Sequence, residues 1–227
     1  MAISELEKVL ADFKTTLDLD VKSLRDLHDK DSGNKGRPGR WLDALKRASI
    51  VLLTANLENY VENLVCEGLL YLCKNKVRAR KYPETYRYWI FKQEINMRNL
   101  SVRDSKDVIE LSMKLWNDIR ELQESELKLD EIKDEFANPT PKNVNWIMGL
   151  LDYENYLDGL NINVLSTSVS AKSTIGEIAK RRNDIAHGDI TQVPTLDDLE
   201  RLVKFSQLFA NRMQKDVTSK IQSCLKA

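Results

Sequence analysis

One short stretch of this chain holds the side chains best suited to chemistry at neutral pH. Residues 180–189 read KRRNDIAHGD and contain His187, one of only two histidines in 227 residues. An ordinary imidazole changes protonation near ~6.5, so histidine is the usual proton donor and acceptor in this range. The other histidine, His28, stands in a polar run that leads into a loop. If the chain is an enzyme, His187 is the expected acid–base residue.

Arg182 and Asn183 add side chains that suit cleavage of a phosphodiester. An arginine offers a planar fork of donors to charge that develops on phosphate oxygens, and an asparagine can orient either partner by hydrogen bonding. RNA supplies its own nucleophile, the 2′-hydroxyl, so this chemistry requires no metal. One histidine beside Asp184 or Asp189 leaves a metal-ligand set incomplete, and glycine-loop, GxSxG and HExxH motifs are absent. We therefore expect neither a metal nor another cofactor.

A single helix does not bring this set together easily. Each residue of an α-helix turns about 100°, so Asn183 and His187 lie about 40° apart, whereas Arg182 and His187 lie about 140° apart. Either the long arginine reaches around the helix, or a second copy of the helix supplies it in a two-fold dimer. The spacing of an arginine followed by four residues and a histidine is weak evidence on its own, because a basic residue matches it by chance roughly once in five or ten cases.

The elements that must position this set are predicted to be helices. The chain has eight glycines, five prolines and 31% charged residues, which together with few alternating β-branched runs favours an all-α fold. Helically spaced apolar residues predict helices over residues 3–28, 40–75, from about 83, 140–152, 170–188 and 195–221. Two surface helices with a break near Glu124 and Ser125 are expected within residues 104–136, a loop at 31–39, and irregular structure at 152–170.

Several residues are predicted to begin or end these helices. Thr140 with Pro141 marks one start, Ser170 or Ser173 the next, and Thr195 with Asp198 the last. Gly188 occupies a normal position just after a helix end. In the long helix at 40–75, Glu58 and Glu62 lie one turn apart, and a solvated pair is a simpler reading than a catalytic dyad.

Basic and aromatic residues are interleaved between residues 74 and 103. The aromatic residues there could stack bases while cations such as Arg78, Arg80 and Lys81 hold phosphates, as in grooves for single-stranded RNA. The alternative is a helix whose aromatic side chains face the core and whose cations are solvated. Residues 104–136 are acidic, so the two regions could also pair within the chain or between subunits. The aromatic residues are Tyr82, Tyr86, Tyr88, Trp89 and Phe91.

Composition narrows the class of protein further. A formal net charge of zero argues against a general polyanion binder. Cys66, Cys73 and Cys224 form neither a CxxC motif nor a cluster with histidine, which indicates a reduced, cytoplasmic protein. The first residues lack the layout of a signal peptide, and the longest apolar run, at residues 50–57, is too short to span a membrane. We therefore expect a cytoplasmic protein without membrane contact.

The motif at residues 182–188 resembles the motif of HEPN domains, which place an arginine, a neighbouring polar residue and a histidine at the end of a helix. Two further stretches, TANLENYVE at 54–62 and NPTPKNV at 138–144, look like the RNase L-type, plasmid-stability branch of this superfamily, RiboL-PSP. The matching segments lie between about residues 40 and 209. The motif is fairly specific as a combination, whereas each flanking match is weak.

The resemblance implies an antiparallel helical bundle in one domain over residues 1–227, with residues 74–136 as an additional helical insert. It implies a homodimeric, metal-independent endoribonuclease in which His187 is the acid–base residue, Arg182 stabilises the phosphate and Asn183 positions the substrate. Cleavage would leave a 2′,3′-cyclic phosphate and a 5′-hydroxyl. Lys180, Arg181, Arg78, Arg80 and Lys81 are the candidate RNA contacts.

Family members of this kind are typically prokaryotic toxins or phage-defence effectors with an antitoxin or a regulatory protein as partner. One alternative is a non-catalytic HEPN-like module that binds RNA or protein through the basic, aromatic segment. Another is a structural bundle in which His187 only caps its helix.

Overall fold

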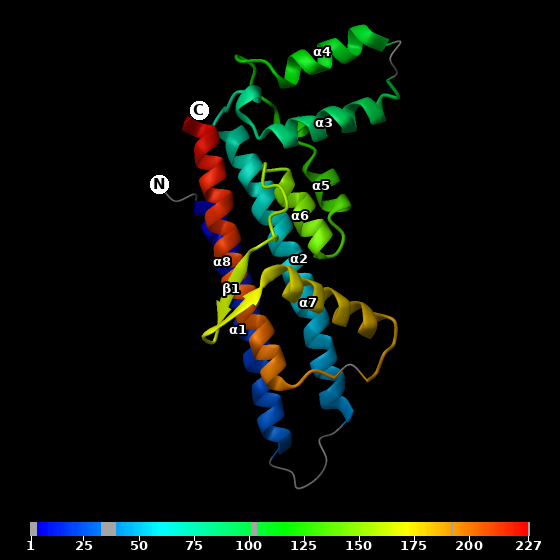
Figure 1. Ribbon diagram of the computed structural model, residues 1–227, viewed down its shortest axis with the longest axis vertical. Helices are drawn as coiled ribbons and strands as arrows, with labels where there is room; N and C mark the ends of the chain where they lie inside the picture. The colour runs from blue at the N-terminus through cyan, green and yellow to red at the C-terminus, as the bar shows by residue number, and fades with distance from the viewer. Residues whose placement is uncertain (1–3, 33–39, 101–103, 192, 227) are drawn as a thin grey trace.

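The protein is almost entirely helical, which confirms the predicted all-α class. A computed structural model describes residues 4–32, 40–100, 104–191 and 193–226 (Figure 1). The predicted loop at 31–39 therefore falls largely outside the described residues. In the described ranges, no helix combines the length and apolar character that a membrane crossing needs. The helices are α1 (Ser4–Ser32), α2 (Arg40–Lys74), η1 (Ala79–Lys81), α3 (Glu84–Met97), α4 (Ser105–Leu115), η3 (Glu124–Glu126), α5 (Leu129–Glu135), α6 (Pro141–Gly149), α7 (Ala171–Ala186) and α8 (Leu196–Lys226).

The long helices α1, α2 and α8 pack against one another and form the core (Figure 1). α1 runs antiparallel to α2, and α8 runs parallel to α2 and antiparallel to α1. Tyr60 of α2 is buried at the centre, where its ring stacks on Phe13 with centroids 4.6 Å apart. The Tyr60 hydroxyl donates to the carbonyl oxygen of Ala210 in α8 at 2.7 Å. The broad apolar surface of α2 thus makes it the central helix, as predicted.

Helices α3 and α4 lie at one end of this core (Figure 1). The basic and acidic regions contact each other there within one chain. The backbones of Arg78 and Glu121 form an antiparallel β-bridge, and the Ala79 amide donates to the Arg120 carbonyl oxygen at 2.7 Å. Two α-helices, α4 and α5, do form within residues 104–136, but α4 already ends at Leu115, and the place of the predicted break near Glu124 and Ser125 is taken by the short helix η3. The Asn117 side chain accepts from the amides of Ile119 and Arg120, and this local turn replaces the helix predicted to continue there.

Residues 152–170 contain a β-hairpin, so the prediction of irregular structure is wrong. β1 (Asn161–Val164) pairs antiparallel with β2 (Thr167–Ser170), and β1 packs against α8. Leu165 and Ser166 form the two-residue turn with φ values of +47° and +67°. Such turns normally use Asn or Gly, which tolerate positive φ. The sequence lacks those residues at the turn, and the usual hairpin signal is therefore missing.

The predicted helix starts are confirmed by hydrogen bonds. Thr140 Oγ1 accepts from the Asn143 amide at 3.2 Å, and Ser170, rather than Ser173, caps α7 by accepting from the Ser173 amide at 3.3 Å. Thr195 and Asp198 cap α8 reciprocally, through bonds of 3.0 and 3.2 Å between each side chain and the other residue's amide. These starts set the directions of α6 and α7, which both pack on α2.

Candidate active site

The end of α7 fixes the position of the candidate catalytic stretch. Ile175, Ile178 and Ala179 are buried along one side of the helix and anchor it to the bundle. At the other end, the Gly188 amide donates to the Ile185 carbonyl oxygen and the Asp189 amide donates to that of Asp184, both at 3.0 Å. With Gly188 at φ +88°, this is a Schellman ending. The predicted role of Gly188 is confirmed, and the helix stops directly at His187.

His187 presents its side chain to solvent at this helix end. Its amide donates to the Asn183 carbonyl oxygen at 2.9 Å, so the backbone still follows the helix. Among the described residues, none forms a hydrogen bond or an ion pair with the imidazole. The ring is therefore accessible to a substrate or to a partner subunit.

Arg182 and Asn183 are half-buried and are joined to each other. Arg182 Nη1 donates to Asn183 Oδ1 at 3.2 Å. The same oxygen accepts from Asn138 Nδ2 at 3.4 Å, so the orientation of the Asn183 amide is set by two donors. In the described part of the chain, nothing accepts from Asn183 Nδ2. This amide group can therefore donate to a bound ligand.

Asn138 and Glu58 support this arrangement and were not among the predicted site residues. The Asn138 amide donates to Glu58 Oε1 of α2 at 3.0 Å, and Asn138 itself has φ +73°. Asn143 Nδ2 holds the same loop from α6 by donating to the carbonyl oxygens of Ala137 and Asn138 at 2.8 and 2.9 Å. The three stretches that resemble HEPN motifs thus meet in one hydrogen-bonded network. The family resemblance marked both residues, but no local pattern assigned them a role in the site.

The prediction that Glu58 and Glu62 form a solvated pair is wrong for Glu58. This residue is half-buried and accepts from the loop before α6. Burial raises the pKa of Glu62, the negative charge of Glu58 raises it further, and Lys133 partly offsets both. This pair of glutamates is therefore partly buried, on the side of α2 that faces the loop before α6.

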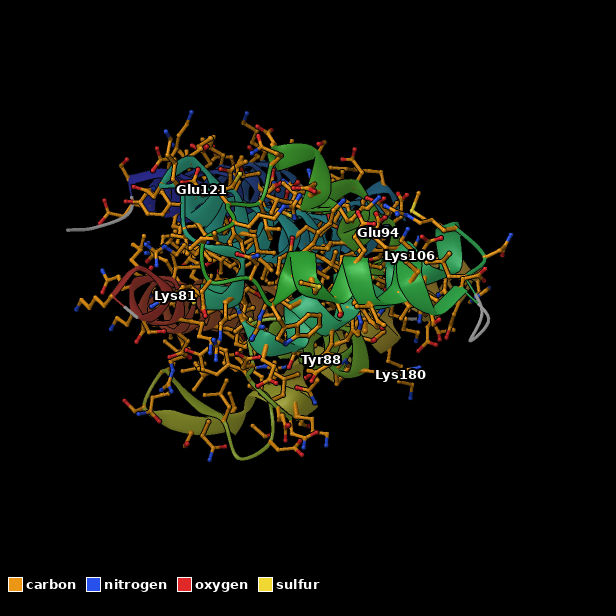
Figure 2. The ribbon with its side chains drawn as sticks, turned by 90° about the horizontal axis from the view of Figure 1, so that it is seen from above. Lys81, Tyr88, Glu94, Lys106, Glu121 and Lys180 are labelled. Atoms are coloured by element: carbon orange, nitrogen blue, oxygen red, sulfur yellow. The ribbon has the colours of Figure 1, made fainter. Side chains whose placement is uncertain are left out.

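Arg182 and His187 do not meet within one chain. Arg182 is hydrogen-bonded to Asn183, and among the described residues no hydrogen bond joins its guanidinium to the His187 ring. Arg181 pairs instead with Glu177 at 3.0 Å and with Asp198 at 3.8 Å. Lys180 is exposed on α7 and is labelled in Figure 2. Of the predicted RNA contacts on α7, only Lys180 is thus left unpaired by the described residues.

Arg78, Arg80 and Lys81 lie in or next to η1, away from α7. Glu58 is the residue of α2 that contacts the candidate site. α2 ends at Lys74, about 24 Å from Glu58 along the helix axis, and η1 follows that end. Arg80 pairs with Asp118 at 2.7 Å. Three of the aromatic side chains in this region are buried, as expected if they face the core instead of stacking on bases: Tyr82, Tyr86 and Trp89. Tyr88, in contrast, is exposed, and Phe91 is half-buried. These burial states are those of the described side chains.

The described residues contain no group of three or more histidine, cysteine, aspartate or glutamate side chains that could hold a metal ion. The family model described as RiboL-PSP-HEPN matches residues 15–219 of the chain. No curated protein and no solved structure matches it.

Proposed function

The chain belongs to the RiboL-PSP-HEPN family, and from this premise we propose that it is a metal-independent endoribonuclease. Its family is one of ribonucleases and RNA-binding modules. The observation that carries the proposal is the intact set of Arg182, Asn183 and His187 at the end of α7, with the Asn183 amide fixed by Arg182 and Asn138. A purely structural helix end gives no reason to place an exposed imidazole one turn from an amide that is fixed in this way.

The proposed reaction is attack of an RNA 2′-hydroxyl on the adjacent phosphorus. The His187 imidazole removes the 2′-hydroxyl proton, the bond from phosphorus to the 5′-oxygen breaks, and the protonated ring returns the proton to that oxygen through a water molecule. Arg182 stabilises the charge on the phosphate oxygens, and Asn183 donates to one of them. The products are a 2′,3′-cyclic phosphate and a 5′-hydroxyl. In the proposed dimer, His187 of one chain works with Arg182 of its partner.

An exposed apolar face on α2 supports the proposed homodimer. Its side chains lie on one side of the first half of the helix, and Trp41 and Leu52 are 46% and 51% exposed. Arg47, on the same half of α2, donates from Nη1 to the carbonyl oxygen of Ile190 at 3.3 Å, so the loop after His187 lies beside it. Ile190 is itself 74% exposed. A second copy packed here would bury apolar surface next to His187. The exposed face comprises Trp41, Ala44, Ala48, Val51, Leu52 and Ala55.

The biological role in the proposal is that of a prokaryotic toxin or phage-defence effector. Uncontrolled cleavage of cellular RNA by such an enzyme would harm its own cell. The proposal therefore includes an antitoxin or regulatory protein that blocks the site.

RNA cleavage in EDTA tests the proposal. The purified protein should cut RNA without added metal, and His187→Ala should abolish cutting while the melting temperature stays unchanged, because the ring has no partner among the described residues. His28→Ala, which removes the other histidine, is the matched control and should leave cutting intact. Cutting that survives His187→Ala would overturn the assignment. RNA binding without cutting by the wild type would support the RNA-binding module instead.

A further inference from the structure

A second concave surface lies between α3 and α4, outside the candidate active site. The cleft has a volume of about 560 Å³, which is within the range of sites that hold small organic ligands. Tyr88 and Phe91 of α3 line one side, and Met113, Trp116, Asn117 and Asp118 of α4 and the following turn line the other. Aromatic faces with a few polar groups at the edge are suited to a flat, partly polar ligand.

The aromatic rings of the cleft are held in place by one another. The Trp116 ring lies 5.0 Å from Tyr88 and 5.8 Å from Phe91, in tilted and edge-on arrangements. The Arg87 guanidinium lies 5.2 Å from the centre of the Trp116 ring, and Arg87 is only 7% exposed. Tyr88, in contrast, is 55% exposed, and Figure 2 shows it at the surface. The cleft therefore combines a fixed indole with an accessible phenol ring.

Charges around the cleft decide which class of flat ligand it favours. An unpaired carboxylate would favour an ammonium group in an aromatic cage, but Asp118 at the rim is paired with Arg80 Nη1 at 2.7 Å. Arg87 already supplies a cation to the Trp116 ring. Lys92 is exposed on α3 one turn after Tyr88. Fixed positive charge next to aromatic faces disfavours a cation and favours a neutral ring that carries phosphate.

We propose that the α3–α4 cleft binds an unpaired nucleobase of an RNA strand, stacked on Tyr88 and Trp116, with a flanking phosphate on Lys92. Asn117 and the Asp118 carboxylate at the edge can hydrogen-bond to the base. This inference rests on the proposed ribonuclease function and adds a second contact for the same substrate. The cleft then selects single-stranded RNA, because a paired base cannot enter it.

The positions of the two sites fit a single strand. Viewed along the long axis of the molecule, Tyr88 and Lys180 lie toward the same side (Figure 2), while Figure 1 places α3 beyond the end of the core and α7 beside its middle. Measured along the axis of α2, the α3–α4 cleft and the candidate active site are about 24 Å or more apart. A dinucleotide is too short to span this distance, so only longer RNA can use both sites.

Binding is best measured in a His187→Ala background, where cutting cannot interfere. Fluorescence anisotropy of a labelled, unstructured RNA oligonucleotide should show binding about tenfold weaker for Tyr88→Ala, whereas Tyr88→Phe, which keeps the ring, should bind like the parent. Ile119→Ala changes an exposed apolar residue close by and is the matched control, which should also bind normally. The same RNA in a duplex should bind all four proteins alike.

Normal RNA binding by Tyr88→Ala, or an equal loss in Tyr88→Phe, would overturn the proposal and leave the cleft to a protein partner. These outcomes do not depend on catalysis, because the background is inactive. In the protein with His187 intact, Tyr88→Ala should raise KM for long RNA without changing kcat and should leave cleavage of a dinucleotide unchanged. A wild type that never cuts RNA would refute the ribonuclease function alone, since the binding comparison would stand.

Discussion

Asn183 is held more firmly than either of the other two candidate catalytic residues. Its amide oxygen accepts from Arg182 and from Asn138, and Asn138 in turn donates its amide to Glu58. These bonds orient the Asn183 NH₂ group before any substrate binds, which is how positioning residues contribute to catalysis. Asn138 is thus a positioning residue for Asn183 in the proposed reaction.

Asn138→Gly tests this role because it removes the side chain and keeps the backbone. Glycine adopts φ +73° without strain, and the amide bond to Glu58 remains possible. We expect kcat for RNA cleavage to fall about tenfold with KM and melting temperature nearly unchanged. Asn155→Gly replaces another asparagine of positive φ, in a loop that contacts the start of α7 rather than its end at His187, and should have no effect on kcat. Equal kcat values in the two variants would show that Asn138 does not position Asn183 for cleavage.

The types of the candidate catalytic residues and their order were visible in the sequence, whereas the residues that support them were not. Arg182, Asn183 and His187 lie within six residues, so helical geometry alone described their relation. Asn138 lies 80 residues from Glu58 and 45 from Asn183 in sequence. Contacts over such separations leave no local periodicity, and Glu58 therefore looked like a solvated residue of α2.

At the scale of elements, the Schellman ending of α7 sets where His187 stands. Gly188 at φ +88° closes the helix, and no atom of the described residues lies within 4 Å of the place where a Cβ atom would be. Any effect of a side chain at this position therefore comes from backbone strain rather than from a clash.

Gly188→Ala should lower the free energy of unfolding by about 1–2 kcal/mol and reduce cleavage, because alanine resists the left-handed conformation that ends α7. Gly149→Ala is the matched control, since a Cβ atom there also meets nothing within 4 Å and its backbone is not left-handed. Urea denaturation of both variants makes the comparison. A Gly188→Ala protein as stable and active as Gly149→Ala would show that the helix ending does not fix the site.

Helix starts could be predicted from single capping residues, but two other elements could not. Thr140, Ser170 and Thr195 each accept the hydrogen bond that their position predicts. The hairpin escaped prediction because Leu165 and Ser166 occupy its turn, where Asn and Gly are expected. The end of α4 depends on the side chain of Asn117 folding back onto two amides, which apolar periodicity does not reveal.

At the scale of the whole molecule, one chain supplies half of the proposed site. Arg182 and His187 are about 140° apart on α7 and are not hydrogen-bonded to each other in the described residues. The apolar face that includes Trp41 and Leu52 lies on the half of α2 that contacts the loop after His187. Burial of that face by a second copy would bring the two sets together.

Mixing two inactive variants tests this central claim most directly. Arg182→Ala and His187→Ala should each fail to cut RNA, while the wild type is a dimer that does cut. If Arg182 of one chain works with His187 of its partner, a mixed dimer holds one intact site. Unfolding and refolding the two variants together should then restore about a quarter of the wild-type rate, because half of the dimers are mixed. A mixture no more active than either variant alone, or a wild type that is strictly monomeric, would contradict the account.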